Sequence, residues 1–158
     1  MELCGAVRDE DVVRVRELIE AGADLNAKDD DGWTALRSAA CNENTEIAKM
    51  LIEAGADLNA KSKNGWTALL TVARDGHTEI VKMLIEAGVD VNAKSKNGWT
   101  ALGWAAEKGH TEIAKMLTEA GADLNAKLNN GWTALRDAAR NGCTEIAKML
   151  IEAGADVK

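Results

Sequence analysis

Residues 94–126, KSKNGWTALGWAAEKGHTEIAKMLTEAGADLNA, contain the pattern from which the fold of this chain can be predicted. The words Gly-Trp-Thr-Ala-Leu, Thr-Glu-Ile, Glu-Ala-Gly and Asp-x-Asn-Ala recur at a period of 33 residues in segments 28–60 and 61–93, and most of them recur again after residue 127. Such a period is typical of a solenoid, because one short unit cannot bury its apolar face alone and must stack on its neighbours. The sequence therefore predicts an all-α array of helix-turn-helix units.

The array is predicted to form one domain, because the repeats run through the chain without a linker. Its expected parts are a modified first repeat, three full repeats and a last repeat, at residues 1–28, 29–61, 62–94, 95–127 and 128–158. Arg14 and Glu17 stand where the next repeat has Ile47 and Met50. These charges predict that residues 1–28 act as an N-terminal cap whose outer face meets water.

The last repeat keeps the apolar residues Ile146, Met149, Leu150 and Ile151, and no polar cap follows them. We therefore expect exposed aliphatic surface on its outer side. The protein is expected to be a monomer, with weak self-association through that uncapped end.

Local signals place the helices within each repeat. Thr34 precedes an apolar run and is predicted to cap a short helix at about residues 35–41, while Thr45 and Glu46 mark the start of a second helix. Glycines such as Gly76 are predicted to end the first helix, because glycine adopts the left-handed conformation without steric strain. Repeat two has Glu43 at that place, so its turn is expected to be the least regular. A hairpin-like loop ending in Asn-Gly or Asp-Gly follows each second helix.

Composition limits the function. The formal net charge of −7 argues against nucleic-acid binding, which depends on clustered Lys and Arg. Three scattered cysteines give no disulfide framework, and no segment approaches the roughly 20 apolar residues of a membrane span. The chain is therefore expected to be cytoplasmic, to act away from membranes and to carry no cofactor.

The repeat resembles that of the ankyrin family. The resemblance rests on the 33-residue period, on Thr100-Ala101-Leu102 followed by Ala105 and Ala106, on the pair Gly109-His110 and on the ending at residues 122–126. The common family wording is Thr-Pro-Leu-His, and this chain lacks both the proline and the histidine in all four repeats, which removes some rigidity at the helix start. The resemblance implies a non-catalytic scaffold that binds protein partners along a groove.

Four positions vary most between the repeats. They are Arg37, Ser38, Cys41 and Asn42, then Leu70, Thr71, Arg74 and Asp75, then Gly103, Trp104, Glu107 and Lys108, and finally Arg136, Asp137, Arg140 and Asn141. At about 100° per residue they are predicted to lie opposite the constant Leu36 and Ala39, on an exposed face. Neutral drift on a solvent face would explain such variation, but exposed Trp104, Leu70 and Cys41 favour a binding face.

Four tryptophans also recur at the repeat period. Each of Trp33, Trp66, Trp99 and Trp132 directly precedes a capping threonine, where a hydrophobic residue can pack on the first helical turn. The family resemblance instead implies a ladder of contacts for a partner, and both roles are compatible. The predicted partner-binding residues are Trp33, Arg37, Cys41, Trp66, Leu70, Arg74, Trp99, Trp104, Glu107, Lys108, Trp132, Arg136 and Arg140. An exposed Trp104 against Trp99 is the predicted hot spot.

No motif indicates catalysis or metal binding. His77, His110 and Cys143 occupy equivalent places in successive repeats. Neighbouring helices lie about 8 to 10 Å apart, too far for these side chains to converge on one zinc ion. The favoured function is a non-catalytic scaffold that binds a protein partner of unknown identity. The alternative is a designed or consensus-like scaffold that folds stably and has no natural partner.

Overall fold

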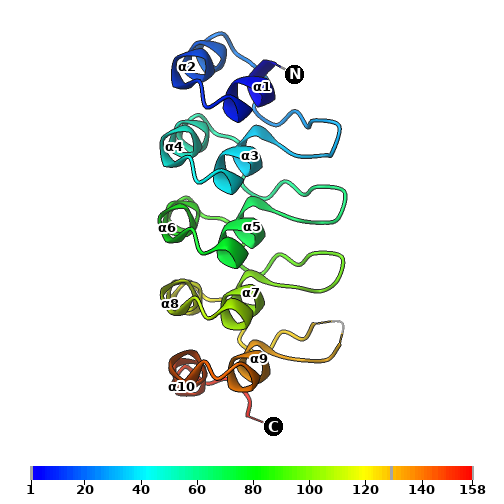
Figure 1. Cartoon of the computed structure of the whole chain (residues 1–158), viewed down its shortest axis with the longest axis vertical. Coiled ribbons are helices and arrows are strands. Elements are labelled where there is room, and N and C mark those ends of the chain that lie inside the picture. The colour runs from blue at the N-terminus through cyan, green and yellow to red at the C-terminus, as the bar shows by residue number, and fades with distance from the viewer. Residues whose placement is uncertain (1, 129, 158) are drawn as a thin grey trace.

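The computed structural model describes residues 2–128 and 130–157; Asn129 and the predicted limits of the array, Met1 and Lys158, lie outside the described residues. The described residues form helices in five consecutive pairs: α1 (Glu2–Arg8) with α2 (Val12–Glu20), α3 (Ala35–Cys41) with α4 (Thr45–Glu53), α5 (Ala68–Asp75) with α6 (Thr78–Glu86), α7 (Ala101–Lys108) with α8 (Thr111–Glu119), and α9 (Ala134–Arg140) with α10 (Thr144–Glu152). The pairs stack along the long axis of the molecule, and the connecting loops project to one side (Figure 1). This confirms the predicted all-α solenoid with hairpin-like loops.

Threonine side chains begin the first helix of four pairs. The hydroxyl of Thr34 accepts a hydrogen bond from the backbone N–H of Arg37 at 3.3 Å, and Thr100 caps α7 in the same way from Gly103 at 3.0 Å. Thr67 and Thr133 cap α5 and α9. The caps predicted from sequence are confirmed, and they satisfy backbone donors that a helix start leaves without partners.

The turn between paired helices requires a left-handed residue. Gly76 has φ of 83° and Gly109 has φ of 76° at this place. Glu43 occupies the equivalent position in repeat two with φ of 56°, and Glu10 does so in the first pair with φ of 55°. The expectation of an irregular turn in repeat two is therefore wrong, because Glu43 adopts the same conformation as the glycines and accepts the steric cost that its Cβ brings.

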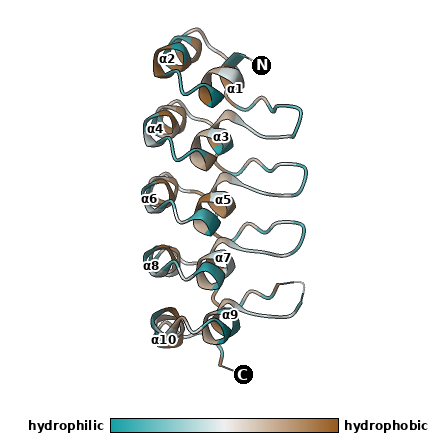
Figure 2. Ribbon diagram, in the orientation of Figure 1, coloured by the Kyte–Doolittle hydropathy of each residue, from teal (hydrophilic) through white to brown (hydrophobic). Residues whose placement is uncertain are grey.

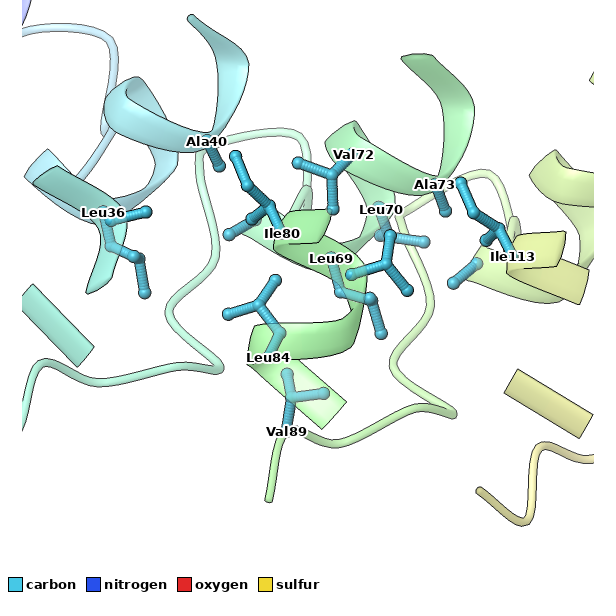
Figure 3. Close-up of a cluster of buried hydrophobic side chains, with 14 of the residues drawn as sticks. Leu36, Ala40, Leu69, Leu70, Val72, Ala73, Ile80, Leu84, Val89 and Ile113 are labelled. Carbon is cyan, nitrogen blue, oxygen red and sulfur yellow. The ribbon is translucent and has the colours of Figure 1, made fainter. Parts of the chain in front are cut away.

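The core runs continuously through the stack. Leucines at one position of the first helices α1, α3, α5 and α7, such as Leu36 and Leu69, are buried together with isoleucines and leucines of the second helices, such as Ile80 and Leu84. Figure 3 shows these side chains filling the space between neighbouring pairs. Each first helix packs on the next first helix, and each second helix on the next second helix. Burial is therefore shared between neighbours, as expected of a solenoid.

Two kinds of hydrogen bond hold the loops: backbone bonds within each loop and bonds to asparagine side chains between neighbouring loops. Within a loop, the N–H of Ser62 donates to the carbonyl of Trp66 at 2.8 Å, and Ser95 pairs with Trp99 in the same way at 3.0 Å. Between loops, the side-chain oxygens of Asn26, Asn59, Asn92 and Asn125 accept from the backbone N–H groups of Asp57, Asp90, Asp123 and Asp156 at 2.7 to 2.8 Å. We call the second set the asparagine ladder. Polar residues predominate along these loops (Figure 2).

The two ends of the stack differ. Arg14 and Glu17 are exposed and lie 3.9 Å apart as an ion pair. At the other end Ile151 is 51% exposed and Val157 is 67% exposed, whereas Ile146 is fully buried. The expectation of outward aliphatic surface is thus correct for Ile151 and wrong for Ile146 and Leu150, because those two side chains are enclosed by the helices already present.

No helix among the described residues is long and apolar enough to cross a membrane.

Candidate functional site

Five indole rings lie at the start of the first helices or on them. Trp33, Trp66, Trp99 and Trp132 are half-buried, as is Trp104 of α7. The ring of Trp104 stacks on that of Trp99, with centroids 4.2 Å apart and planes at 20°. It also lies 5.6 Å from the ring of Trp66 in the preceding repeat. The predicted meeting of Trp99 and Trp104 is confirmed, and a third indole joins them.

Cationic side chains cover the same rings. The guanidinium carbon of Arg37 lies 3.4 Å from the ring centroid of Trp33, and that of Arg74 lies 4.8 Å from Trp66. Around Trp132 the guanidinium carbons of Arg136 and Arg140 lie at 4.3 and 5.2 Å. The ammonium of Lys108 lies 5.8 Å from the Trp104 ring. We call these five tryptophans and five cations the tryptophan strip.

The repeated tryptophans pack on the first turn of the helix that follows them. Trp33 contacts Arg37 and Trp132 contacts Arg136, each four residues further on. At the equivalent place in α7, a Cβ on Gly103 would lie 3.4 Å from the Trp99 ring. The structural role weighed from sequence is therefore present, and the half-exposed rings still leave surface for a partner.

Several variable positions are buried, contrary to the prediction from sequence. Arg37 is 7% exposed and Leu70 is 1% exposed, and Ser38, Thr71 and Asp137 are buried as well. The helical-wheel argument placed them opposite the constant face but left out contacts with neighbouring repeats, such as the hydrogen bond from Arg37 to Thr71 of α5. The position of Gly103 shows the cause, since a Cβ there would lie 3.5 Å from the Leu128 side chain in the next loop. Variation at these sites is therefore partly variation in packing.

The other variable positions reach the surface. Cys41, Arg74 and Glu107 are half-buried, while Lys108, Arg136 and Arg140 are exposed. Arg136 is exposed although Arg37 and Leu70 are buried at the same position, because no following loop covers it in the described chain. Arg136 also lines a cavity of about 500 Å³ together with Leu135, Ile151 and Val157.

Three buried polar atoms near the strip have no hydrogen-bond partner among the described residues: Nη1 of Arg37, Nε1 of Trp104 and Oδ2 of Asp137. The Nε of Arg37 does donate to the Thr71 hydroxyl at 3.2 Å. Burial lowers the pKa of the Arg37 guanidinium from its ordinary value. The pKa of Asp137 is raised to about 6, first by burial and then by the negative charge of Glu107, with Arg140 partly offsetting both effects.

The histidines begin second helices and contact the preceding repeat. Nδ1 of His77 lies 3.3 Å from a carboxylate oxygen of Glu43, and Nε2 of His110 lies 2.9 Å from the backbone carbonyl of Arg74. Cys143 begins α10 without a side-chain cap. Within residues 2–128 and 130–157, no group of three or more His, Cys, Asp or Glu side chains could hold a metal ion.

Sequence reasoning missed the asparagine ladder, although the motif Asp-x-Asn recurs at residues 24–26, 57–59, 90–92 and 123–125. Its signal was the pairing of the two residues: the Asp57 carboxylate accepts from the N–H of Asn59 at 2.9 Å, which fixes the loop that presents the Asn59 side chain to Asp90. The motif was interpreted as extended chain only. It stabilises the loops from which the tryptophan strip begins.

Comparison with known proteins agrees with this geometry. A family model described as ankyrin repeats in three copies matches residues 3–62, 59–128 and 94–158. No curated protein sequence matches the chain. The family matches span nearly the full sequence and coincide with the stacked helix pairs and the projecting loops. The chain therefore belongs to the ankyrin repeat family.

Proposed function

We propose that this chain is a non-catalytic protein-binding module whose partner docks on the tryptophan strip. Ankyrin repeats generally serve as protein–protein interaction modules. The observation that carries the proposal is the strip itself, in which five half-buried indoles and five cations gather along the first helices. Indoles offer a large contact area with little rotamer entropy to lose, and Trp and Arg are among the residue types most enriched at binding hot spots.

The repeats differ where the strip is exposed, which supports a partner-specific surface. Glu107, Lys108 and Arg140 occupy positions that other repeats fill with different residues. By contrast, the exposed lysines of the second helices, Lys82 and Lys115, stand at a position that is constant from α4 to α10. A side chain that is the same in every repeat gives no specificity for a particular partner.

The test compares three proteins as baits for partners in cell extract. They are the unchanged chain, a strip variant with Lys108, Arg136 and Arg140 changed to Glu, and a control variant with Lys82, Lys115 and Lys148 changed to Glu. Both variants change the net charge by the same amount, so only the location of the change differs. We expect the unchanged and control chains to retain the same protein and the strip variant to lose it.

Retention by the strip variant would place the binding surface elsewhere. If the unchanged chain retains no protein at all, the alternative of a folding scaffold without a partner is favoured. Thermal denaturation of all three proteins provides the folding control, since the six substituted residues are exposed.

A further inference from the structure

Three acidic residues beside the tryptophan strip have partners or are buried. Asp75 pairs with Arg74 at 2.9 Å. A carboxylate oxygen of Glu107 accepts from the side-chain amide of Asn141 at 3.2 Å. Asp137 is 3% exposed. Cations and anions alternate along this surface: Asp75 is paired and Asp137 is buried, while Glu107 keeps its charge and Arg140 interacts with the Asp137 carboxylate.

The cations at the C-terminal half of the strip are free to bind an anion. Lys108, Arg136 and Arg140 are exposed, and none has a carboxylate within 4.0 Å among the residues that the structure describes. Arg136 and Arg140 are one helical turn apart and contact the same Trp132 ring. Two like charges held at one ring repel each other, and an anion between them would relieve that repulsion.

Their contact with Trp132 also orients them. A guanidinium that lies over an indole is held through its face, and its N–H groups remain available in its own plane. Such groups bind a carboxylate through paired, charge-assisted hydrogen bonds. Holding the two side chains on one ring lowers the entropy that binding would otherwise cost.

An apolar subsite lies one repeat before Trp132 and its two arginines. The stacked rings of Trp99 and Trp104, with Trp66 beside them, are half-buried and leave part of the cluster exposed. α7 and α9 are neighbouring first helices, whose axes are expected to lie about 8 to 10 Å apart, and we take the cluster and the Trp132 ring to be separated by a similar distance. An extended peptide covers that distance in about three residues.

We propose that the partner presents an acidic, extended segment to the strip: a carboxylate sits between Arg136 and Arg140, and an aromatic or aliphatic side chain about three residues away packs on Trp99 and Trp104. This inference rests on the proposed function and specifies its partner chemistry. It selects against basic segments, which Arg136 and Arg140 repel. The acidic exterior of the molecule, with a net charge of −7, makes such a local cationic site a discriminating feature.

The test uses a displayed library of random peptides of about 12 residues, about 40 Å when extended. It is selected separately on the unchanged chain, on Arg136→Gln/Arg140→Gln, and on the matched control Lys115→Gln/Lys148→Gln. We expect the unchanged and control chains to enrich peptides with Asp or Glu about three positions from an aromatic or aliphatic residue. The Arg136→Gln/Arg140→Gln chain should lose the acidic enrichment and keep part of the apolar one.

An enriched peptide and its Glu→Gln analogue then serve as probes in a direct affinity measurement. We expect the analogue to bind the unchanged chain about tenfold more weakly, and the difference to shrink between about 50 and 300 mM NaCl. Enrichment of basic or neutral peptides would overturn the inference and leave the proposed function standing, and so would an acidic preference that survives loss of both arginines. Failure of all three chains to enrich any peptide would count against both.

Discussion

At the scale of single residues, Asp137 is the side chain whose burial most opposes its charge. Its pKa is raised from 3.8 to about 6, so ionisation above that pH costs the folded protein free energy that the unfolded chain does not lose. We expect Asp137→Asn to raise the free energy of unfolding by about 1 to 3 kcal/mol at pH 7.5. Denaturant titration measures it.

The pH dependence separates this cause from others. A raised pKa means that the folded state holds the proton of Asp137 more tightly than the unfolded state does. The stability that the protonated carboxyl contributes is therefore fully present below pH 4 and is lost as pH rises through about 6. The gain from Asn should therefore grow between pH 4 and about pH 6.5 and level off above it. A gain that is constant with pH, or a loss, would show that the Asp137 carboxylate is favourably bound in the folded state.

Trp104 requires a revised expectation. The sequence predicted an exposed hot spot, but the Trp104 ring is half-buried, stacks on Trp99 and lies against Trp66. We expect Trp104→Ala to lower the free energy of unfolding by about 1 to 3 kcal/mol, as well as weakening binding. Trp104→Phe should keep most of the stability, because it preserves the stack. An Ala variant as stable as the unchanged protein would mean that the indole cluster contributes little to the fold.

At the scale of elements, the turn that joins α3 to α4 carries a strained residue. Glu43 has φ of 56° where Gly76 and Gly109 stand in later repeats. We expect Glu43→Gly to raise the melting temperature, with a gain of about 0.5 to 1 kcal/mol after the greater entropy of unfolded glycine is counted. Thermal denaturation checks the direction.

Glu43→Gly also removes a contact, because a carboxylate oxygen of Glu43 lies 3.3 Å from Nδ1 of His77. The Glu43 side chain is 64% exposed. Such exposed pairs contribute little. Glu43→Gly on a His77→Ala background isolates this contact, and Glu10→Gly tests the same turn in the first pair, where φ is 55°. A fall in melting temperature on both backgrounds would rule out backbone strain as the dominant effect.

Features that depend on contacts within a few residues were predicted correctly from the sequence, and features that depend on contacts far along the chain were not. The capping hydrogen bond of Thr34 and the left-handed turn at Gly76 depend on residues within one turn of helix, so the local sequence indicated both. Arg37 is buried and donates to Thr71, 34 residues further along the chain, a contact that a single helical wheel does not contain. The stacking of Trp99 on Trp104 was therefore predicted correctly and the exposure of the first variable positions incorrectly, while the binding role of these residues stays a prediction.

At the scale of the whole molecule, stability is expected to depend on where an interface is damaged. Leu102 is 1% exposed in the middle of the stack, and Leu102→Ala should cost about 2 to 5 kcal/mol. Ile151→Ser, at a side chain that is 51% exposed, serves as the comparison and should cost little. Denaturant midpoints measure both. Equal losses would mean that the outer face of α10 is covered in solution by another molecule.

Amide hydrogen exchange measures the local stability of each part of the stack. The last helix pair contacts a neighbour on one side only in the described chain, so residues 133–157 should open before α5 to α8. Exposed Ile151 and Val157 should also favour association at high protein concentration. Uniform protection in a monomer whose behaviour does not change with concentration would exclude both fraying and end-to-end association.

The asparagine ladder has an evolutionary consequence. Asn59 binds the N–H of Asp90 as Asn92 binds that of Asp123, at 2.8 and 2.7 Å and across the same interval of 31 residues. Excision of residues 60–92 would therefore place Asn59 where Asn92 now stands, with Asp123 as its donor. Unequal recombination can change the number of repeats in this gene without leaving an unmatched loop. What each such event alters is the order of indoles and cations along the array, while the fold is preserved.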